Sequence, residues 1–339
     1  MENITIKQLA KELNLSIGTV SKALRDSHEI SPETKQKVFA LAQKLHFVPN
    51  PYASSLRQKK SKTIAVVFPE VADSFFSLAI NGIESVAQAK GYHVLIYLTH
   101  ESFEKEQAIL QDFGSGRVDG VLISPSSETA LMDHIQALRE KQVPVVFFDR
   151  GIGQSEMAQI TTNDFSSAYE ATRHLLDRGC QRIGFLSVSR GLYIMQQRLA
   201  GYQQALVDAN RPVEEEVIVE SDCSATESKQ RITAMLQMPR RVDGVFASVE
   251  QLAMATYQIC EELNLSIPEQ VKVLCYSNLP TAALLNPSLT TVTQPAFDMG
   301  KAAATVLFKA LEKRHFNAKE ASVQLPSRLF PRLSTGMEP

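Results

Sequence analysis

The 339-residue sequence lacks most of the signatures of an enzyme or a metalloprotein. It contains no GxGxxG dinucleotide fingerprint, no GxxxxGK[ST] phosphate loop and no GxSxG nucleophile elbow. Its seven histidines form no HExxH or HxH cluster. Its four cysteines form no CxxC pair, so we expect reduced thiols at Cys180, Cys223, Cys260 and Cys275. The sequence therefore predicts no catalytic activity, no cofactor and no metal site.

Long apolar runs are also absent. No window approaches the roughly 18 uninterrupted apolar residues that a membrane span needs. The first residues, MENIT, lack the basic region and apolar run of a secretory signal. We therefore expect a cytoplasmic protein without a membrane partner. Little chain follows the last predicted strand, near Leu329, which predicts no heptad tail for tetramer formation.

Charge is unevenly distributed along the chain. Residues 1–62 contain eleven Lys and Arg but five Asp and Glu, a net charge of +6, while the remainder carries −8. A basic head attracts phosphate groups, and an acidic body discourages non-specific DNA contact elsewhere. Lysine-rich surface helices are common, so charge alone leaves a solvated helix face as an alternative.

The opening stretch, residues 5–24, predicts two short helices joined by a tight polar turn. Thr5 and Gln8 form a capping box, and Ser16 is placed to cap a second helix, with Thr19 three residues on. Apolar residues recur at helical spacing at Ile6, Leu9, Ala10, Leu13, Ile17, Val20 and Leu24. Ser31 and Pro32 begin a third helix. This pattern favours a helix-turn-helix, with an ordinary helical hairpin as the alternative.

From Thr63 onward, apolar runs alternate with amphipathic helical stretches. Strands are predicted at 64–68, 94–98, 120–123, 145–148, 182–186, 217–219, 244–247 and 271–275, and near residues 323 and 329. Helices are predicted at 75–90, 103–113, 128–142, 166–178, 196–210, 226–237, 252–263 and 296–313. Continuous apolar runs indicate strands covered on both faces. The alternation predicts doubly wound parallel α/β sheets in two lobes.

Three sequence segments carry a specific resemblance. The runs TVSKAL, SPETKQKV and PNPYASSLR, the last followed by a basic tail, resemble the LacI/GalR family of bacterial transcription regulators, and the likeness extends over nearly the whole chain. The resemblance implies a three-helix domain at 1–48, a hinge at 49–60 and an effector-binding and dimerisation domain at 61–339. It also implies lobes similar to those of periplasmic sugar-binding proteins, at 61–161 with 293–320 and at 162–290 with 321–339.

The function that the resemblance implies is repression of transcription. The expected partners are a palindromic double-stranded DNA operator, a second copy of the chain and a small effector bound between the lobes. The expected effector is of carbohydrate type, phosphorylated or oligomeric sugars included, with a nucleobase as the next choice. A transport-linked solute-binding protein would instead carry a signal peptide and no basic head. An enzyme would need a nucleophile–base pair or a cofactor loop.

Residues expected to contact DNA follow from the same resemblance. Ile17, Gly18 and Lys22 occupy positions that read base edges, and Lys22 can donate to guanine. Thr19, Ser21 and Lys35 are expected at phosphates, and the contact set also includes Thr5, Ser16, Asn50, Ala53 and Arg57. Leu56 matches a residue that wedges into the minor groove. The alternatives are a solvated helix face for the lysines and a contact with the body for Leu56.

Residues expected to contact the effector lie mostly at predicted strand ends, where ligands of parallel sheets bind. They are Phe75, Phe76, Ser124, Asp149, Arg198, Cys223, Glu250, Ser277 and Gln294. Among them, Phe75, Phe76 and Arg198 are implied by the family resemblance. Core packing is the alternative for either phenylalanine, and a surface position is the alternative for Arg198. Several positions of the body depart from the family pattern: Val249 replaces an Asn, Glu250 replaces an Asp, Ser277 lacks the usual carboxylate, and Cys223 stands where some relatives have an aromatic residue. These departures argue against a simple free hexose.

Overall fold

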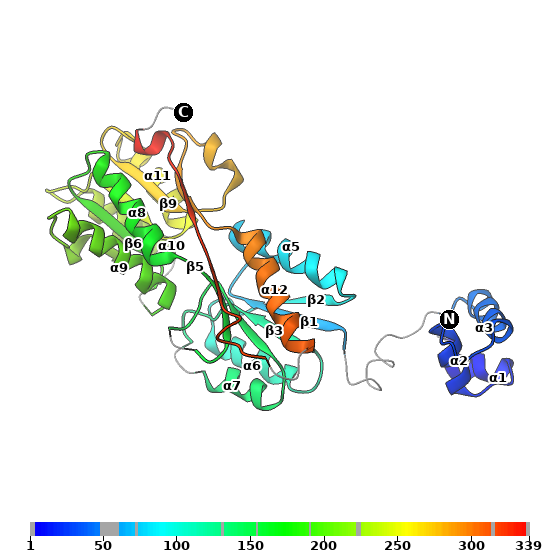
Figure 1. The fold of residues 1–339 in the computed structure, drawn as a ribbon. Helices are drawn as coiled ribbons and strands as arrows, with labels where there is room; N and C mark the ends of the chain where they lie inside the picture. The colour runs from blue at the N-terminus through cyan, green and yellow to red at the C-terminus, as the bar shows by residue number, and fades with distance from the viewer. Residues whose placement is uncertain are drawn as a thin grey trace. The chain divides into compact units, whose positions relative to one another are not determined.

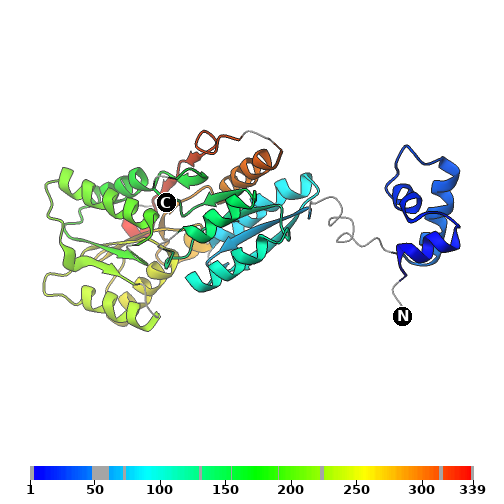
Figure 2. The same ribbon diagram turned by 90° about the horizontal axis from the view of Figure 1, so that it is seen from below.

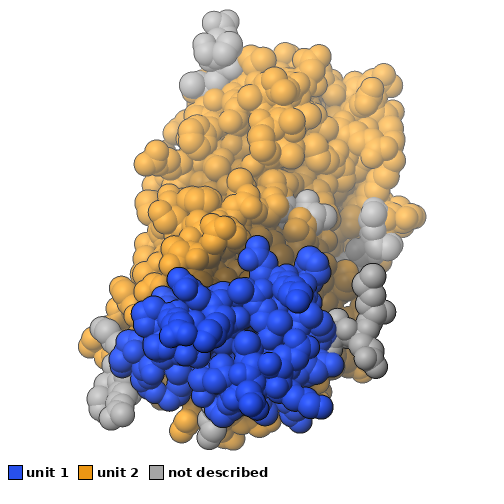
Figure 3. Space-filling view, turned by 90° about the vertical axis from the view of Figure 1, so that its right-hand side faces the viewer, with its two compact units in different colours: residues 1–61 blue, residues 62–339 orange. Residues whose placement is uncertain are grey.

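The computed structural model describes residues 4–47, 61–71, 74–129, 132–153, 155–189, 191–221, 225–312 and 316–336. The chain forms two compact units, Met1–Ser61 and Lys62–Pro339 (Figure 3).

The described residues of the first unit form three helices around a small apolar core. They are α1 (Ile6–Glu12), α2 (Ile17–Leu24) and α3 (Pro32–Lys44). The predicted caps are confirmed: Thr5 and Gln8 form the capping box of α1, Ser16 accepts from the Thr19 amide, and Ser31 caps α3. The buried side chains are Leu9, Ala10, Val20, Ala23, Val38 and Ala42. So few buried residues give a small domain only a modest core.

The first lobe of the second unit is a parallel sheet with helices on both faces (Figure 1). Its strands, in the order β11-β5-β4-β3-β1-β2, are β11 (Val323–Leu325), β5 (Ala158–Thr162), β4 (Val145–Phe148), β3 (Gly120–Ile123), β1 (Thr63–Phe68) and β2 (His93–Leu98). One face packs against α5 (Ser74–Ala89) and α12 (Ala296–Glu312). The other face packs against α6 (Phe103–Phe113) and α7 (Asp133–Glu140).

The second lobe repeats this architecture (Figure 2). Its strand order is β12-β10-β9-β8-β6-β7, with β12 (Arg328–Phe330), β10 (Thr290–Thr293), β9 (Lys272–Tyr276), β8 (Gly244–Ala247), β6 (Ile183–Ser187) and β7 (Ile218–Glu220). Only β12 pairs antiparallel within this sheet. One face packs against α8 (Asp164–Asp177) and α9 (Tyr193–Asp208), the other against α10 (Ala225–Leu236) and α11 (Glu250–Glu262). The 3-10 turns are η1 (Glu215–Val217), η2 (Pro280–Leu284) and η3 (Leu333–Thr335).

The sequence pattern is wrong about one strand and misses two others, β5 and β10, the second of which it takes only for a crossing between the lobes. It predicts the strand near Val323 in the second lobe, but β11 pairs with β5 of the first sheet, and only β12 joins the second. Strand β5 is missed because Gln159 and Thr161 interrupt its apolar residues. The chain therefore crosses between the lobes after β5, after β10 and again between β11 and β12.

Strand β2 differs from the expectation that the strands are covered on both faces. It lies at the edge of the first sheet, and its Leu95 and Ile96 side chains are exposed. In contrast, every residue of β1 is buried, as its continuous apolar run predicts. Position within the sheet, which local sequence does not encode, accounts for the difference.

Close helix packing in both lobes depends on glycine. A Cβ on Gly82 of α5 would lie 2.1 Å from the Phe297 carbonyl oxygen of α12, and one on Gly300 would lie 2.1 Å from the Ala79 oxygen. In the second lobe, a Cβ on Gly201 of α9 would lie 2.2 Å from the Phe165 oxygen of α8. No real Cβ fits at such distances, so each helix pair packs backbone against backbone at these positions.

Candidate DNA-binding and effector sites

The predicted DNA-reading residues lie at or near the start of α2. Ile17 is 46% exposed although it is apolar, and a Cβ on Gly18 would meet only the Ser16 hydroxyl, at 3.6 Å. Lys22 lies in the last turn of the helix and pairs with the Glu29 carboxylate. Ion pairing with Lys22 holds the pKa of Glu29 below its usual value. Helix α2 therefore presents an exposed apolar side chain and a glycine in its first turn, and a cation in its last turn.

The predicted phosphate contacts already make hydrogen bonds within the unit. The hydroxyls of Ser16 and Thr19 lie 2.8 Å apart, and Thr5 interacts with Gln8. Ser21 accepts from Arg25 at 3.3 Å, and Lys35 donates to the Asp26 carboxylate at 2.6 Å. The predicted hinge contacts Asn50, Ala53, Leu56 and Arg57 lie outside the described residues.

A cavity of about 50 Å³ between the lobes brings together most of the predicted effector residues. Its lining includes Phe75, Phe76, Asp149, Arg198, Glu250, Ser277 and Gln294. Both phenylalanines also pack in the core. The ring centroid of Phe75 lies 5.6 Å from that of Phe148, and the ring centroid of Phe76 lies 4.8 Å from that of Phe68. Sequence segments more than two hundred residues apart thus contribute to one cleft.

Asp149 occupies a strained position at the end of β4. Its φ is 62°, in the left-handed region that few residues other than glycine adopt. Gln294 donates to its carboxylate at 3.3 Å and to the Thr162 hydroxyl at 3.1 Å. Burial raises the pKa of Asp149 to about 7, although Arg198 and Arg150 oppose this rise. Its carboxyl therefore takes up a proton close to neutral pH.

Arg198 is buried at the centre of a polar network. Its Nε donates to the Asp164 carboxylate at 2.8 Å, and its Nη1 donates to the Ser248 carbonyl oxygen at 2.8 Å. The guanidinium lies 3.6 Å from the centroid of the Tyr276 ring. Asp164 and Tyr276 are not among the predicted site residues. Asp164 follows β5, so recognising that strand would have indicated a polar group at a strand end.

The Glu250 carboxylate is the acceptor of three hydrogen bonds at the cleft. One oxygen of Glu250, at the start of α11, accepts from the Ser277 hydroxyl at 2.7 Å and from the Asn278 amide at 2.8 Å. The Ser74 hydroxyl of the first lobe donates to the same oxygen. The two departures from the family pattern are thus in direct contact, and Glu250 also joins the two lobes.

One predicted effector residue among those the structure describes, Ser124, is not brought into this cavity. Ser124 is fully buried at the end of β3, its hydroxyl has no hydrogen-bond partner among the described residues, and it lines neither cavity of the cleft. Cys223 lies outside the described residues.

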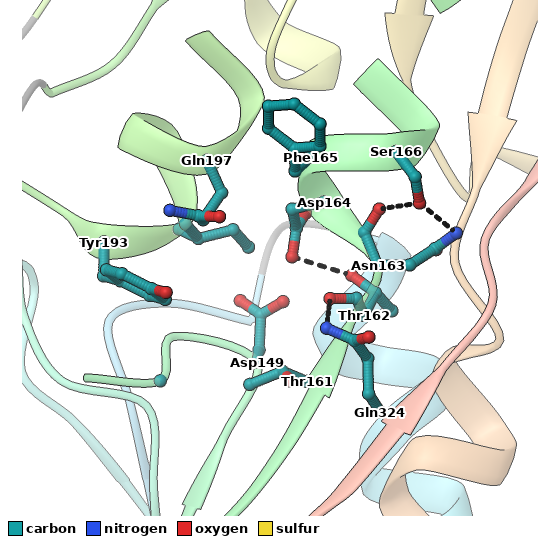
Figure 4. A pocket seen from close by; sticks show the side chains of 12 residues that line it. Asp149, Thr161, Thr162, Asn163, Asp164, Phe165, Ser166, Tyr193, Gln197 and Gln324 are labelled. Carbon is teal, nitrogen blue, oxygen red and sulfur yellow. Dashed lines mark hydrogen bonds between the residues drawn. The ribbon is translucent and has the colours of Figure 1, made fainter. Parts of the chain in front are cut away.

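A larger cavity of about 260 Å³ adjoins the first (Figure 4). Asp149 and Ile194 line both cavities. The remaining lining residues come from β5 and from the starts of α8 and α9, with Gly151 and Gln324, and are Thr161, Thr162, Asn163, Asp164, Phe165, Ser166, Tyr193 and Gln197. None of these is a predicted site residue, again because β5 is missed.

Two kinds of feature are absent from the described part of the chain. No helix there is both long and apolar enough to cross a membrane. No group of three or more His, Cys, Asp or Glu side chains in the same residues is placed to hold a metal ion.

Comparison with known proteins gives the same division of the chain. Residues 5–50 match the family described as bacterial regulatory proteins, lacI family, and residues 172–335 match the periplasmic binding protein-like domain. Catabolite control protein A of Priestia megaterium is 26% identical over 98% of this chain and 99% of its own length. The ribose operon repressor of Halalkalibacterium halodurans is 28% identical over 98% of this chain and 97% of its own length.

Solved structures agree with these relatives. A LacI family regulator from Enterococcus faecium with bound ribose superposes with a TM-score of 0.71, at 26% identity, over 80% of this chain and 98% of that one. The transcriptional regulator CelR in complex with cellobiose superposes with a TM-score of 0.74 over 98% of this chain and 99% of that one, at 23% identity. The two proteins therefore share the fold. The chain therefore joins a lacI-family helix-turn-helix region to a periplasmic binding protein-like domain, and LacI-family transcriptional regulators are among its homologues and structural neighbours.

Proposed function

We propose that the protein is a cytoplasmic transcriptional repressor that binds a palindromic operator as a homodimer and is controlled by a carbohydrate-type effector. The observation that carries the proposal is the combination, in one chain, of a basic helix-turn-helix and a two-lobed domain in which most of the predicted effector residues line one cleft. The two-fold symmetry of a dimer matches a palindrome.

The effector acts by changing the balance between two arrangements of the lobes. Contacts that join the lobes cross the cleft at Glu250 and Ser74, while Gln294 on the connection after β10 holds Asp149. A ligand that inserts among these groups alters the angle between the lobes. Effector binding is coupled to DNA binding if the two arrangements of the lobes differ in their affinity for the operator.

Exposed apolar residues support the homodimer. Leu95 and Ile96 lie on the edge strand β2, and Leu284 is 80% exposed. Exposed apolar groups on an unpaired sheet edge favour association with another chain. Ile96→Lys should therefore yield monomers in sedimentation and lower operator affinity.

A binding experiment across a salt series tests the DNA-binding function. Genomic fragments selected by the intact protein are compared with scrambled duplexes of equal length. We expect preference for a palindromic fragment and a steep loss of affinity with salt. Leu56→Ala should lower specific affinity more than non-specific affinity. Equal weak binding to every duplex, with and without sugars and nucleobases, would refute the proposal.

A further inference from the structure

The two cavities of the cleft differ greatly in size. The larger has a volume of about 260 Å³ and the smaller one of about 50 Å³. If each water molecule takes up roughly 15 Å³ of such a cavity, the larger cavity has room for more than a dozen waters and the smaller for about three. Asp149 lies where they meet, since it lines both. The space available to a ligand therefore extends from the predicted effector residues past Asp149 toward β5.

Two aromatic side chains of the larger cavity are left largely uncovered. Phe165, at the start of α8, is 41% exposed, and Tyr193, the first residue of α9, is 40% exposed. Figure 4 shows Phe165 on one side of the labelled carboxylates and Tyr193 on another. Aromatic side chains combine a large apolar ring face with rigid geometry, which suits them to bind flat, partly apolar ligands.

Unused hydrogen-bonding groups surround these rings. The Gln197 amide and the Thr161 hydroxyl line the cavity, and neither hydrogen-bonds to any residue that the structure describes. One carboxylate oxygen of Asp149 accepts from Gln294, which leaves the other available to a ligand within the described structure. Neutral amides, hydroxyls and a carboxylate around exposed aromatic rings match the alternating hydroxyl and C–H groups of a sugar ring.

The charges at this cavity disfavour an anionic ligand. Its charged lining residues are the carboxylates Asp149 and Asp164. The nearby guanidinium groups are already committed, that of Arg198 to Asp164 and that of Arg150 to Glu101 at 2.7 Å. A phosphate placed here would face Asp149 with no uncommitted cation among the described lining residues.

We propose that the larger cavity is a subsite for the second ring of a neutral disaccharide, bound across Asp149 between Phe165 and Tyr193. This inference rests on the proposed function, because it assumes a carbohydrate effector in the cleft. It adds that two rings bind better than one, and that a phosphorylated sugar binds worse than its neutral parent.

Calorimetric titration of the full chain with matched sugars tests the subsite. Glucose is compared with maltose and cellobiose, galactose with lactose, and glucose with glucose 6-phosphate. We expect one disaccharide to bind about tenfold or more tightly than its constituent monosaccharides. Phe165→Ala and Gln197→Ala should each reduce that advantage to about threefold or less, with little change for the monosaccharide.

Phe297→Ala is the matched control, because Phe297 is a 43% exposed aromatic residue in the first turn of α12, outside the lining of both cavities. It should leave every affinity unchanged. A monosaccharide that binds as tightly as every disaccharide, or a disaccharide advantage that survives both variants, would overturn the subsite while the carbohydrate effector stands. Failure of all these sugars to bind would overturn both.

Discussion

Arg198 and Asp164 form a buried ion pair that joins α9 to the start of α8, with Nε and Oδ1 2.8 Å apart. The side chains are only 3% and 6% exposed, respectively. The Thr162 hydroxyl donates to the second oxygen of Asp164 at 3.0 Å, so both partners are well satisfied. Such a pair fixes geometry at the cleft more than it stabilises the fold, since two buried charges lose their hydration.

Removing one partner should therefore be far more damaging than removing both. Asp164→Leu leaves an uncompensated buried guanidinium and should lower the free energy of unfolding by about 3–5 kcal/mol, measured in urea. The double variant Asp164→Leu/Arg198→Met removes both charges and should recover at least half of that loss. Additive losses in the double variant would show that the two side chains are not coupled.

Protonation of Asp149 should make stability depend on pH. Because the folded protein holds this proton up to about pH 7 while the unfolded chain releases it near pH 3.8, the folded state binds more protons between these values. The stability contributed by Asp149 should thus fall as pH rises from 4 to 7, by up to about 1.4 kcal/mol per pH unit, and level off above 7.

Comparison of wild type with Asp149→Asn isolates this effect. The variant should gain stability relative to wild type as pH rises through that interval, as followed by urea unfolding. Asp298→Asn, at an exposed carboxylate in the first turn of α12, is the matched control. A wild-type-minus-variant difference that stays flat from pH 4 to 8 would rule out a buried, late-titrating Asp149.

Glu250 should contribute stability through its hydrogen bonds to the second lobe. Glu250→Ala leaves the buried Ser277 hydroxyl without its acceptor and should cost about 1–3 kcal/mol in urea unfolding. Ser277→Ala should cost less when Glu250 is already alanine. The neighbouring Gln251→Ala is the control, because Gln251 is exposed and its side chain makes only a long hydrogen bond, 3.5 Å to Glu70, within the described part of the chain. Equal effects of the two alanine variants would contradict this role.

Gly82 should tolerate no side chain. In Gly82→Ala the new Cβ meets a backbone oxygen of α12, so the two helices must separate, with a loss of about 1–3 kcal/mol or more in the unfolding of residues 62–339. Gly18→Ala is the matched control: its helix has space for a methyl group and gains helix propensity. An unchanged melting temperature for Gly82→Ala would mean that the helices pack less closely than the structure shows.

We expect Lys22 to contact a base edge of the operator and not only the phosphate backbone. Lys22→Met should weaken binding to the selected operator by about 1–3 kcal/mol and relax specificity at one base pair, measured by competition with single-base operator variants. Lys37→Met, which removes an exposed lysine paired with Glu33 on α3, should weaken all duplexes alike and only slightly. A uniform loss for Lys22→Met would assign that residue to a phosphate.

The sequence by itself determined the local structure of the first unit. The caps at Thr5, Ser16 and Ser31 bond to groups three residues further along the chain and need no distant partner. The local sequence is therefore sufficient to predict where these helices begin. Buried strands such as β1 were equally visible, because an uninterrupted apolar run has few other stable environments. Most of the smaller cavity followed from strand ends and from the family resemblance.

Only the tertiary structure decided what depends on contacts between distant segments. The mixed polar sequence of β5 becomes a strand because β4 and β11 pair with it, and that pairing brings Asp164 and the larger cavity into the cleft. The exposure of Leu95 follows from the edge position of β2. Glu250 accepts a hydrogen bond from Ser277, 27 residues further along the chain, because the fold brings the start of α11 next to the end of β9.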